Sequence, residues 1–249
     1  MSQAPDDDFA RKSVDPWGVT GRATLHDRPI HGLPIHGFLV RGLLACGVAA
    51  PLLAFATTVA AMALYPGFNP ARQYISELGG PTASHPIVFN AGVFVAGVMA
   101  GLAGCGFGLA ISRLAPTSGV RGARVVGLLT ALVFLLAGWG LVQSSIYHWP
   151  DRRHLAINLA LGIQLAPLFL LWGLWPRPDL KRLKLFLGLV FVAMAVLTVL
   201  TKHLLLPNLV NDDNVGWWER AYAIILVGWV GVAAFALDRR LLKPATIPV

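Results

Sequence analysis

Residues 87–111 read IVFNAGVFVAGVMAGLAGCGFGLAI, a stretch without a single Asp, Glu, Lys or Arg. A helix needs about 20 predominantly apolar residues to cross the ~30 Å hydrocarbon core of a bilayer, and this stretch exceeds that length. A charge at the bilayer centre costs about 2.5–3.5 kcal/mol, so a spanning helix normally lacks one there. The stretch therefore predicts a transmembrane helix, and it decides the class of the protein.

The same pattern recurs along the chain. Further apolar stretches cover residues 38–64, 125–147, 155–175, 185–205 and 219–237, and no charged residue lies in the centre of any of them. The chain is 56% hydrophobic and 13% charged, whereas a soluble domain is usually about a quarter charged. We therefore predict an all-α bundle of six transmembrane helices over residues 38–240. A Pro-, Gly-, Asp- and Arg-rich tail at 1–37 is expected to be disordered, and a short tail follows at 241–249.

The basic residues show which side of the membrane each end occupies. Most Lys and Arg residues lie in the tails and in the second and fourth connections between stretches. The exceptions are Arg72, Arg152, Arg153, Lys202 and Arg220. The positive-inside rule therefore predicts that both termini are cytoplasmic. The net charge of +8 is thus explained by topology, and we expect membrane lipids rather than nucleic acid as partners.

Four glycines recur at helical spacing within the stretch quoted above: Gly97, Gly101, Gly104 and Gly108. Small residues let two membrane helices approach closely, so this face is predicted to be a helix-packing surface. The packing partner is either another helix of the same chain or a helix of a second copy or another membrane protein.

Polar side chains gather on the predicted outer side, and the closest spacing is that of His148, Asp151 and His154. Histidine and carboxylate ligands suit zinc or iron, so these residues are candidate metal ligands and catalytic residues, with His203 as a further candidate ligand. The alternative is that Asp151 caps the following helix and the histidines form interfacial hydrogen bonds.

The first outer connection offers a second, weaker pair of candidates. Ser76 and Glu77 could act as hydroxyl and base, although no nucleophile-elbow pattern surrounds them. The simpler interpretation is that Glu77 forms an ion pair with Arg72 or Arg152. No phosphate-binding glycine motif is present, so no nucleotide cofactor is expected.

Four short motifs carry a family resemblance: YPGFNP (65–70), ISELG (75–79), HP (85–86) and NAG (90–92). Together they resemble the first outer loop of the bacterial and archaeal membrane family known as Domain of Unknown Function 998, and the resemblance extends over residues 38–240. It implies a six-helix integral membrane protein, and we expect a bacterial cytoplasmic membrane. The family brings no established reaction with it.

Three functions fit these observations. We favour a non-enzymatic membrane protein that binds a lipid or a membrane partner through its polar outer cap. The first alternative is a metal-dependent lipid hydrolase that uses His148, Asp151 and His154. The second alternative is a small-solute transporter, although the centres of the predicted helices carry no titratable group of the kind that coupled carriers bury.

Overall fold

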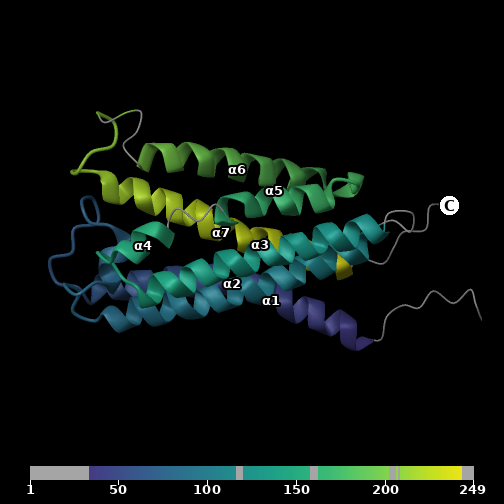
Figure 1. Cartoon of the computed structure of the whole chain (residues 1–249), viewed down its shortest axis with the longest axis horizontal. Helices are drawn as coiled ribbons and strands as arrows, with labels where there is room; N and C mark the ends of the chain where they lie inside the picture. Colours follow the sequence, from purple (N-terminus) through teal and green to yellow (C-terminus); the bar gives the residue numbers. More distant parts are fainter. Residues whose placement is uncertain (1–33, 116–119, 158–161, 202–205, 207, 243–249) are drawn as a thin grey trace, which may run out of the picture.

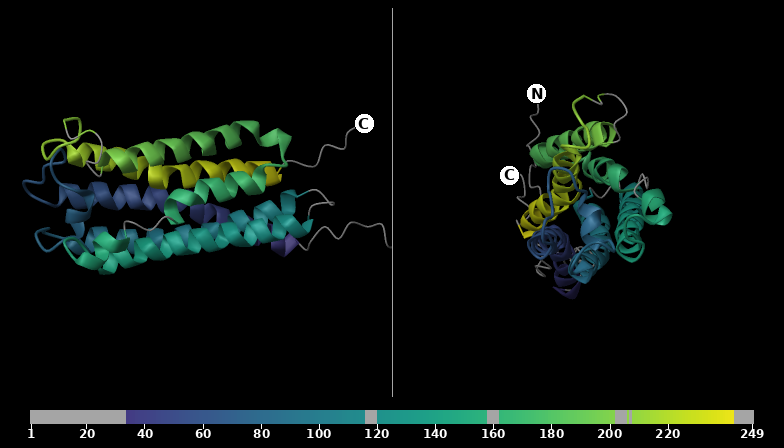
Figure 2. Two further views of the ribbon diagram at one scale, coloured as in Figure 1. Left: turned by 45° about the horizontal axis from the view of Figure 1, so that its top comes forward. Right: turned by 90° about the vertical axis from the view of Figure 1, so that its left-hand side faces the viewer.

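The computed structural model describes residues 34–115, 120–157, 162–201, 206 and 208–242, and these residues form a bundle of helices without a strand (Figure 1). The helices are α1 (Pro34–Ala63), η1 (Ile75–Gly79), α2 (Pro86–Leu114), α3 (Val120–Ile146), α4 (Arg152–Ile157), α5 (Gly162–Leu174), η3 (Pro178–Leu180), α6 (Lys181–Thr201) and α7 (Val215–Leu242). The long helices run side by side along one axis (Figure 2). Helix α2 packs between α1 and α3, while α7 contacts α1 and α6.

Five of these helices are long and apolar enough to cross a membrane: Gly37–Ala63, Pro86–Leu114, Arg121–Ile146, Pro178–Thr201 and Val215–Leu242. They correspond to five of the six predicted spans. The remaining stretch, 155–175, contains the end of α4 and the 13 residues of α5. At about 1.5 Å per residue, α5 alone is shorter than the hydrocarbon core. The described residues therefore establish five candidate spans and leave the sixth unconfirmed.

The ends of the helical region differ slightly from the prediction. Helix α1 begins at Pro34, before the expected boundary at residue 38, because proline suits the first turn of a helix. Helix α7 continues to Leu242, and Leu241 packs against the hydrophobic core there. The rest of both predicted tails, 1–33 and 243–249, lies outside the described residues.

The glycine face of α2 lies against α3. A Cβ atom on Gly104 would lie 2.1 Å from the Phe134 Cβ, and one on Gly97 would lie 2.8 Å from the Gly138 carbonyl oxygen. The partner glycines are equally close, since a Cβ on Gly127 would lie 2.5 Å from the Gly108 oxygen. The glycines thus bring the two backbones together, as small residues do in membrane helix pairs.

The core of the bundle is almost entirely apolar. Rings from three helices pack against one another at tilted angles, with centroids 4.9 Å apart for Phe107–Phe134 and 5.6 Å apart for Phe134–Trp229. Large apolar side chains such as Leu128 and Leu185 point outward and are 72% and 66% exposed. Apolar residues on both the inside and the outside suit a helix bundle whose solvent is lipid.

Candidate functional site

One end of the bundle is covered by polar segments that we call the cap: residues 65–85 between α1 and α2, residues 147–151 between α3 and α4, and residues 215–220 at the start of α7. The cap begins with a tight turn at Tyr65–Phe68, in which the Phe68 amide donates to the Tyr65 carbonyl. Pro66 and Gly67 occupy its two central positions, and Gly67 has a φ of 77°. Only a residue that tolerates positive φ fits there, which explains the Pro-Gly pair.

Glu77 organises the middle of the cap from within its own short helix. One carboxylate oxygen accepts a hydrogen bond from the Tyr74 amide at 2.8 Å, and the other accepts one from Gln73 Nε2 at 3.1 Å. The predicted ion pair of Glu77 with Arg72 or Arg152 is therefore wrong. Arg72 instead pairs with Asp213 at 2.8 Å, because local capping engages both oxygens of Glu77.

The start of α7 holds the cap on one side. The Gly216 amide donates to the Ala71 carbonyl at 2.7 Å, and a Cβ on Gly216 would lie only 2.5 Å from the Pro70 oxygen. The Ile75 amide donates to the Glu219 carboxylate. This contact joins segments that are far apart in sequence, and it needs a glycine because backbone carbonyls fill the space beside it.

Arg220 lies beneath the same contact. Its Nη1 donates to the Gln73 carbonyl at 3.0 Å and to the Gly216 carbonyl at 2.7 Å, and its guanidinium lies 5.3 Å from the Phe68 ring centre. Its Nε and Nη2 atoms are buried and have no hydrogen-bond partner among the described residues. Two nitrogen donors of the Arg220 guanidinium therefore lack a hydrogen-bond acceptor among the described residues.

Helix α2 and the α3–α4 connection hold the cap on its other sides. Asn90 Nδ2 donates to the Gly79 carbonyl at 3.0 Å, and a Cβ on Gly80 would lie 2.9 Å from the Trp149 carbonyl oxygen. The Tyr74 and Trp149 rings lie 5.8 Å apart. The ISELG motif, together with Tyr74 and Gly80 on either side of it, therefore meets α7, α2 and the α3–α4 connection.

The electrostatics of the cap follow from this enclosure. Burial raises the pKa of Tyr74, and the negative charges of Glu219, Asp212 and Glu77 raise it further. Tyr74 therefore stays protonated at neutral pH. It can act as a hydrogen-bond donor but not as a base.

Two residues of the predicted metal site, Asp151 and His154, have structural partners. Asp151 accepts a hydrogen bond from the Arg153 amide at 2.8 Å and so caps α4, as the alternative interpretation predicted. Hydrogen bonds from the Arg153 side chain and amide lower the pKa of Asp151 to about 2. His154 is buried, with its Nδ1 2.8 Å from the Tyr147 carbonyl oxygen.

Among the described residues, no group of three or more His, Cys, Asp and Glu side chains is placed to hold a metal. His148 is exposed, and His203 lies outside the described residues. Ser76 is half-buried, and both oxygens of its neighbour Glu77 are already engaged. The structure therefore does not assemble the predicted catalytic candidates into one site within its described part.

Sequence reasoning missed a second polar cluster, below the cap, where α5, α6 and α7 meet. Gln164 Nε2 donates to Thr198 Oγ1 at 2.8 Å and to the Tyr222 hydroxyl at 3.0 Å. The three residues lie on three different helices, and Thr198 and Tyr222 follow Gln164 by 34 and 58 residues, so only the packing of the helices reveals the group. Gln73, Gly216 and Arg220 were also missed, because their roles depend on the contact between the cap and α7.

The comparisons with known proteins agree with the motifs. No curated protein and no solved structure matches the chain significantly. A family model described as "Protein of unknown function (DUF998)" matches residues 48–236, which is most of the region expected from the resemblance. The chain therefore belongs to the DUF998 family.

Proposed function

We propose that the chain is a six-span protein of a bacterial cytoplasmic membrane, with both termini in the cytoplasm, and that its outward-facing cap binds the headgroup of a lipid. The topology is supported by the arrangement of the described helices. Helix α1 begins, and α7 ends, at the end of the bundle opposite the cap (Figure 1). Two ends on one side require an even number of crossings, and residues 152–174 would supply the sixth.

The charges of the two ends support the orientation. Exposed basic side chains gather at the end opposite the cap, among them Arg113, Arg121 and Arg124. In the cap, acidic and basic residues nearly balance. The basic end is the cytoplasmic end under the positive-inside rule, so the cap faces outward.

Arg220 is the observation that carries the lipid-binding proposal. A buried donor without an acceptor costs about 1–3 kcal/mol, and more when the group is charged. A phosphate oxygen is the acceptor that a guanidinium edge binds best. The cap would open locally to admit the phosphate between Arg220 and the 65–85 connection.

The test is headgroup-dependent lipid binding by the detergent-purified protein, measured by native mass spectrometry. Phosphatidylethanolamine with palmitoyl and oleoyl chains is compared with diacylglycerol carrying the same chains. The wild type is expected to prefer the phospholipid, and Arg220→Lys to weaken its binding about tenfold or more, since charge-assisted hydrogen bonds are lost.

Arg72→Lys is the matched control, because Arg72 lies in the same cap but is exposed and pairs with Asp213. Its phospholipid binding should equal that of the wild type. Equal binding of the two lipids, or an unchanged affinity in Arg220→Lys, would contradict the proposal. About one zinc or iron per chain, lost in a His148→Ala/His154→Ala variant, would instead favour the metal-dependent hydrolase.

A further inference from the structure

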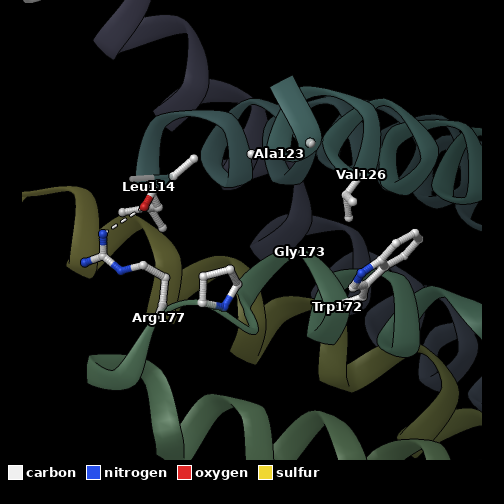
Figure 3. A pocket seen from close by; sticks show the side chains of 9 residues that line it. Leu114, Ala123, Val126, Trp172, Gly173 and Arg177 are labelled. Carbon is white, nitrogen blue, oxygen red and sulfur yellow. Dashed lines mark hydrogen bonds between the residues drawn. The ribbon is translucent and has the colours of Figure 1, made fainter. Parts of the chain in front are cut away.

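Two arginines, one at each end of the bundle, differ in how their guanidinium groups are held. Arg177 borders a pocket of about 290 Å³ at the end opposite the cap (Figure 3). All three of its guanidinium nitrogens donate, Nη1 to the Leu114 carbonyl at 2.8 Å, and Nε and Nη2 to the Asp179 carboxylate at 2.9 and 3.0 Å. Arg220 donates through Nη1 alone among the described residues, and its Nε and Nη2 are buried without an acceptor. Arg177 is therefore fully engaged in the fold, whereas one edge of the Arg220 guanidinium is not.

The first connection, residues 65–85, determines how Arg220 is oriented. Arg220 Nη1 donates to the Gln73 carbonyl at 3.0 Å and to the Gly216 carbonyl at 2.7 Å, which uses both of its hydrogens. Gly216 belongs to the same helix as Arg220, so it moves with that helix. The contacts from outside the helix are the Gln73 carbonyl and the Phe68 ring, whose centre lies 5.3 Å from the guanidinium carbon.

The Gln73 carbonyl is in turn held by Glu77. The Gln73 side chain accepts a hydrogen bond from the Asn69 amide at Oε1, at 2.6 Å, so its Nε2 end faces Glu77 and donates to Oε2 at 3.1 Å. Glu77 Oε1 accepts from the Tyr74 amide at 2.8 Å. The Tyr74 N–H and the Gln73 carbonyl belong to one planar peptide group and point in opposite directions. This rigid group therefore lies between Glu77 on one side and Arg220 on the other.

We propose that Glu77 and Gln73 are positioning residues of the headgroup site, which fix the direction that the Nε–Nη2 edge of Arg220 faces. The inference rests on the function proposed for the cap, in which that edge binds a phosphate. It also gives a role to two of the motifs found in the sequence. Asn69 lies in YPGFNP and Glu77 lies in ISELG, and both motifs support the same arginine through Gln73.

The side chains of Gln73 and Glu77 can be exchanged without the loss of a hydrogen bond. Glu77→Gln alone places two amide groups together, so one of the three hydrogen bonds is lost whichever way the amides turn. Gln73→Glu alone places two carboxylates together. In Gln73→Glu/Glu77→Gln the new glutamate accepts from the Asn69 amide, and the new glutamine donates to it while it accepts from the Tyr74 amide. The double variant thus restores all three hydrogen bonds and the net charge.

Native mass spectrometry of the detergent-purified chain provides the measurement, again with palmitoyl-oleoyl phosphatidylethanolamine and the matching diacylglycerol. Glu77→Gln should weaken phosphatidylethanolamine binding about fivefold, since one hydrogen bond of the support is lost, and leave diacylglycerol binding unchanged. Gln73→Glu/Glu77→Gln should return phosphatidylethanolamine binding to near the wild-type value. Asp212→Asn is the charge control, because Asp212 is exposed and its charge also reaches Tyr74. This variant should bind as the wild type does.

A second comparison separates positioning from a general effect on folding. In an Arg220→Lys background, Glu77→Gln should cause no further loss, because a residue that acts through Arg220 has no guanidinium edge left to orient. An equal loss in both backgrounds overturns the proposal. So does wild-type binding by Glu77→Gln, or a double variant that binds no better than Glu77→Gln.

The two proposals fail in different ways. A wild type that binds phosphatidylethanolamine and diacylglycerol equally overturns the cap proposal and this inference together. A wild type that prefers phosphatidylethanolamine and loses the preference in Arg220→Lys, but not in Glu77→Gln, overturns this inference alone.

Discussion

At the scale of single residues, the cap depends on a glycine, which has no side chain, and on carboxylates that accept hydrogen bonds from residues close to them in sequence. Gly216 is surrounded by the carbonyl oxygens of Pro70, Ala71 and Gln73. Asp151 could be interpreted correctly from sequence, because capping acts between neighbours in the chain. The partners of Glu77 could not, because the Tyr74 amide and the Gln73 side chain compete with the arginines for its carboxylate oxygens.

Gly216→Ala is expected to destabilise the protein by about 1–3 kcal/mol, because the new methyl group would lie 2.5–2.8 Å from three backbone oxygens that cannot rotate away. Thermal unfolding in detergent, followed by circular dichroism, provides the measurement. Gly188→Ala is the control, since its methyl group enters open space and should be neutral or slightly stabilising. Equal melting temperatures for the two variants would show that the Gly216 contact is not tight.

The charge of Asp151 should matter only above a certain pH. The pKa of Asp151 is about 2 in the folded protein, below the ordinary aspartate value of 3.8 that applies to the unfolded chain. The charge of Asp151 therefore contributes stability above about pH 4, and this stability is lost as the pH falls toward 2. Asn is also a good helix cap, so Asp151→Asn removes the charge and keeps the cap. The small melting difference between wild type and variant should therefore be constant near neutral pH and shrink below pH 4. A difference that does not change with pH would contradict this assignment.

At the scale of elements, the sequence predicts the long helices well because each is a continuous apolar stretch. The stretch 155–175 is apolar throughout, and its proline, Pro167, lies inside α5, while residues 158–161 lie outside the described part of the chain. The sequence predicts the glycine face of α2 but does not identify α3 as the helix that packs on it. The facing glycines on α3, Gly127 and Gly138, become meaningful only when the two helices are placed together.

The four glycines of the α2 face that packs on α3 should not tolerate substitution equally. A Cβ on Gly104 meets the Phe134 Cβ at 2.1 Å, whereas one on Gly101 meets nothing closer than the end of the Leu135 side chain at 3.4 Å. Gly104→Ala should therefore cost about 1–3 kcal/mol, and Gly101→Ala should be close to neutral. Melting temperatures of the two variants in the same detergent check this order. The reverse order would mean that the helices pack in a different register.

At the scale of the whole molecule, the charge asymmetry could be derived from sequence, while the cap site could not. The cap site depends on the half-buried Arg220, whose Nε and Nη2 atoms are buried by contacts that form only in the fold. The proposed topology is the prediction on which the orientation of the cap depends.

Cysteine labelling in intact cells tests that topology. In a background with Cys46→Ala and Cys105→Ala, a membrane-impermeant maleimide should label Thr82→Cys in the cap without lysis. It should label Arg121→Cys and Ser13→Cys only after lysis, because those positions are expected in the cytoplasm. Labelling of Ser13→Cys and Thr82→Cys from the same side would contradict the crossing by α1 on which the proposed topology depends.

The contact between the first connection and the last helix has a consequence for biosynthesis. A ribosome makes residues 65–85 early, but Gly216, Glu219 and Arg220 emerge only after most of the chain has been made. Until then, the Ala71 and Gln73 carbonyls and the Ile75 amide lack the partners they have in the finished fold. The cap is therefore completed last. A chain that stops before α7 keeps these two carbonyls and this amide without the partners that α7 supplies.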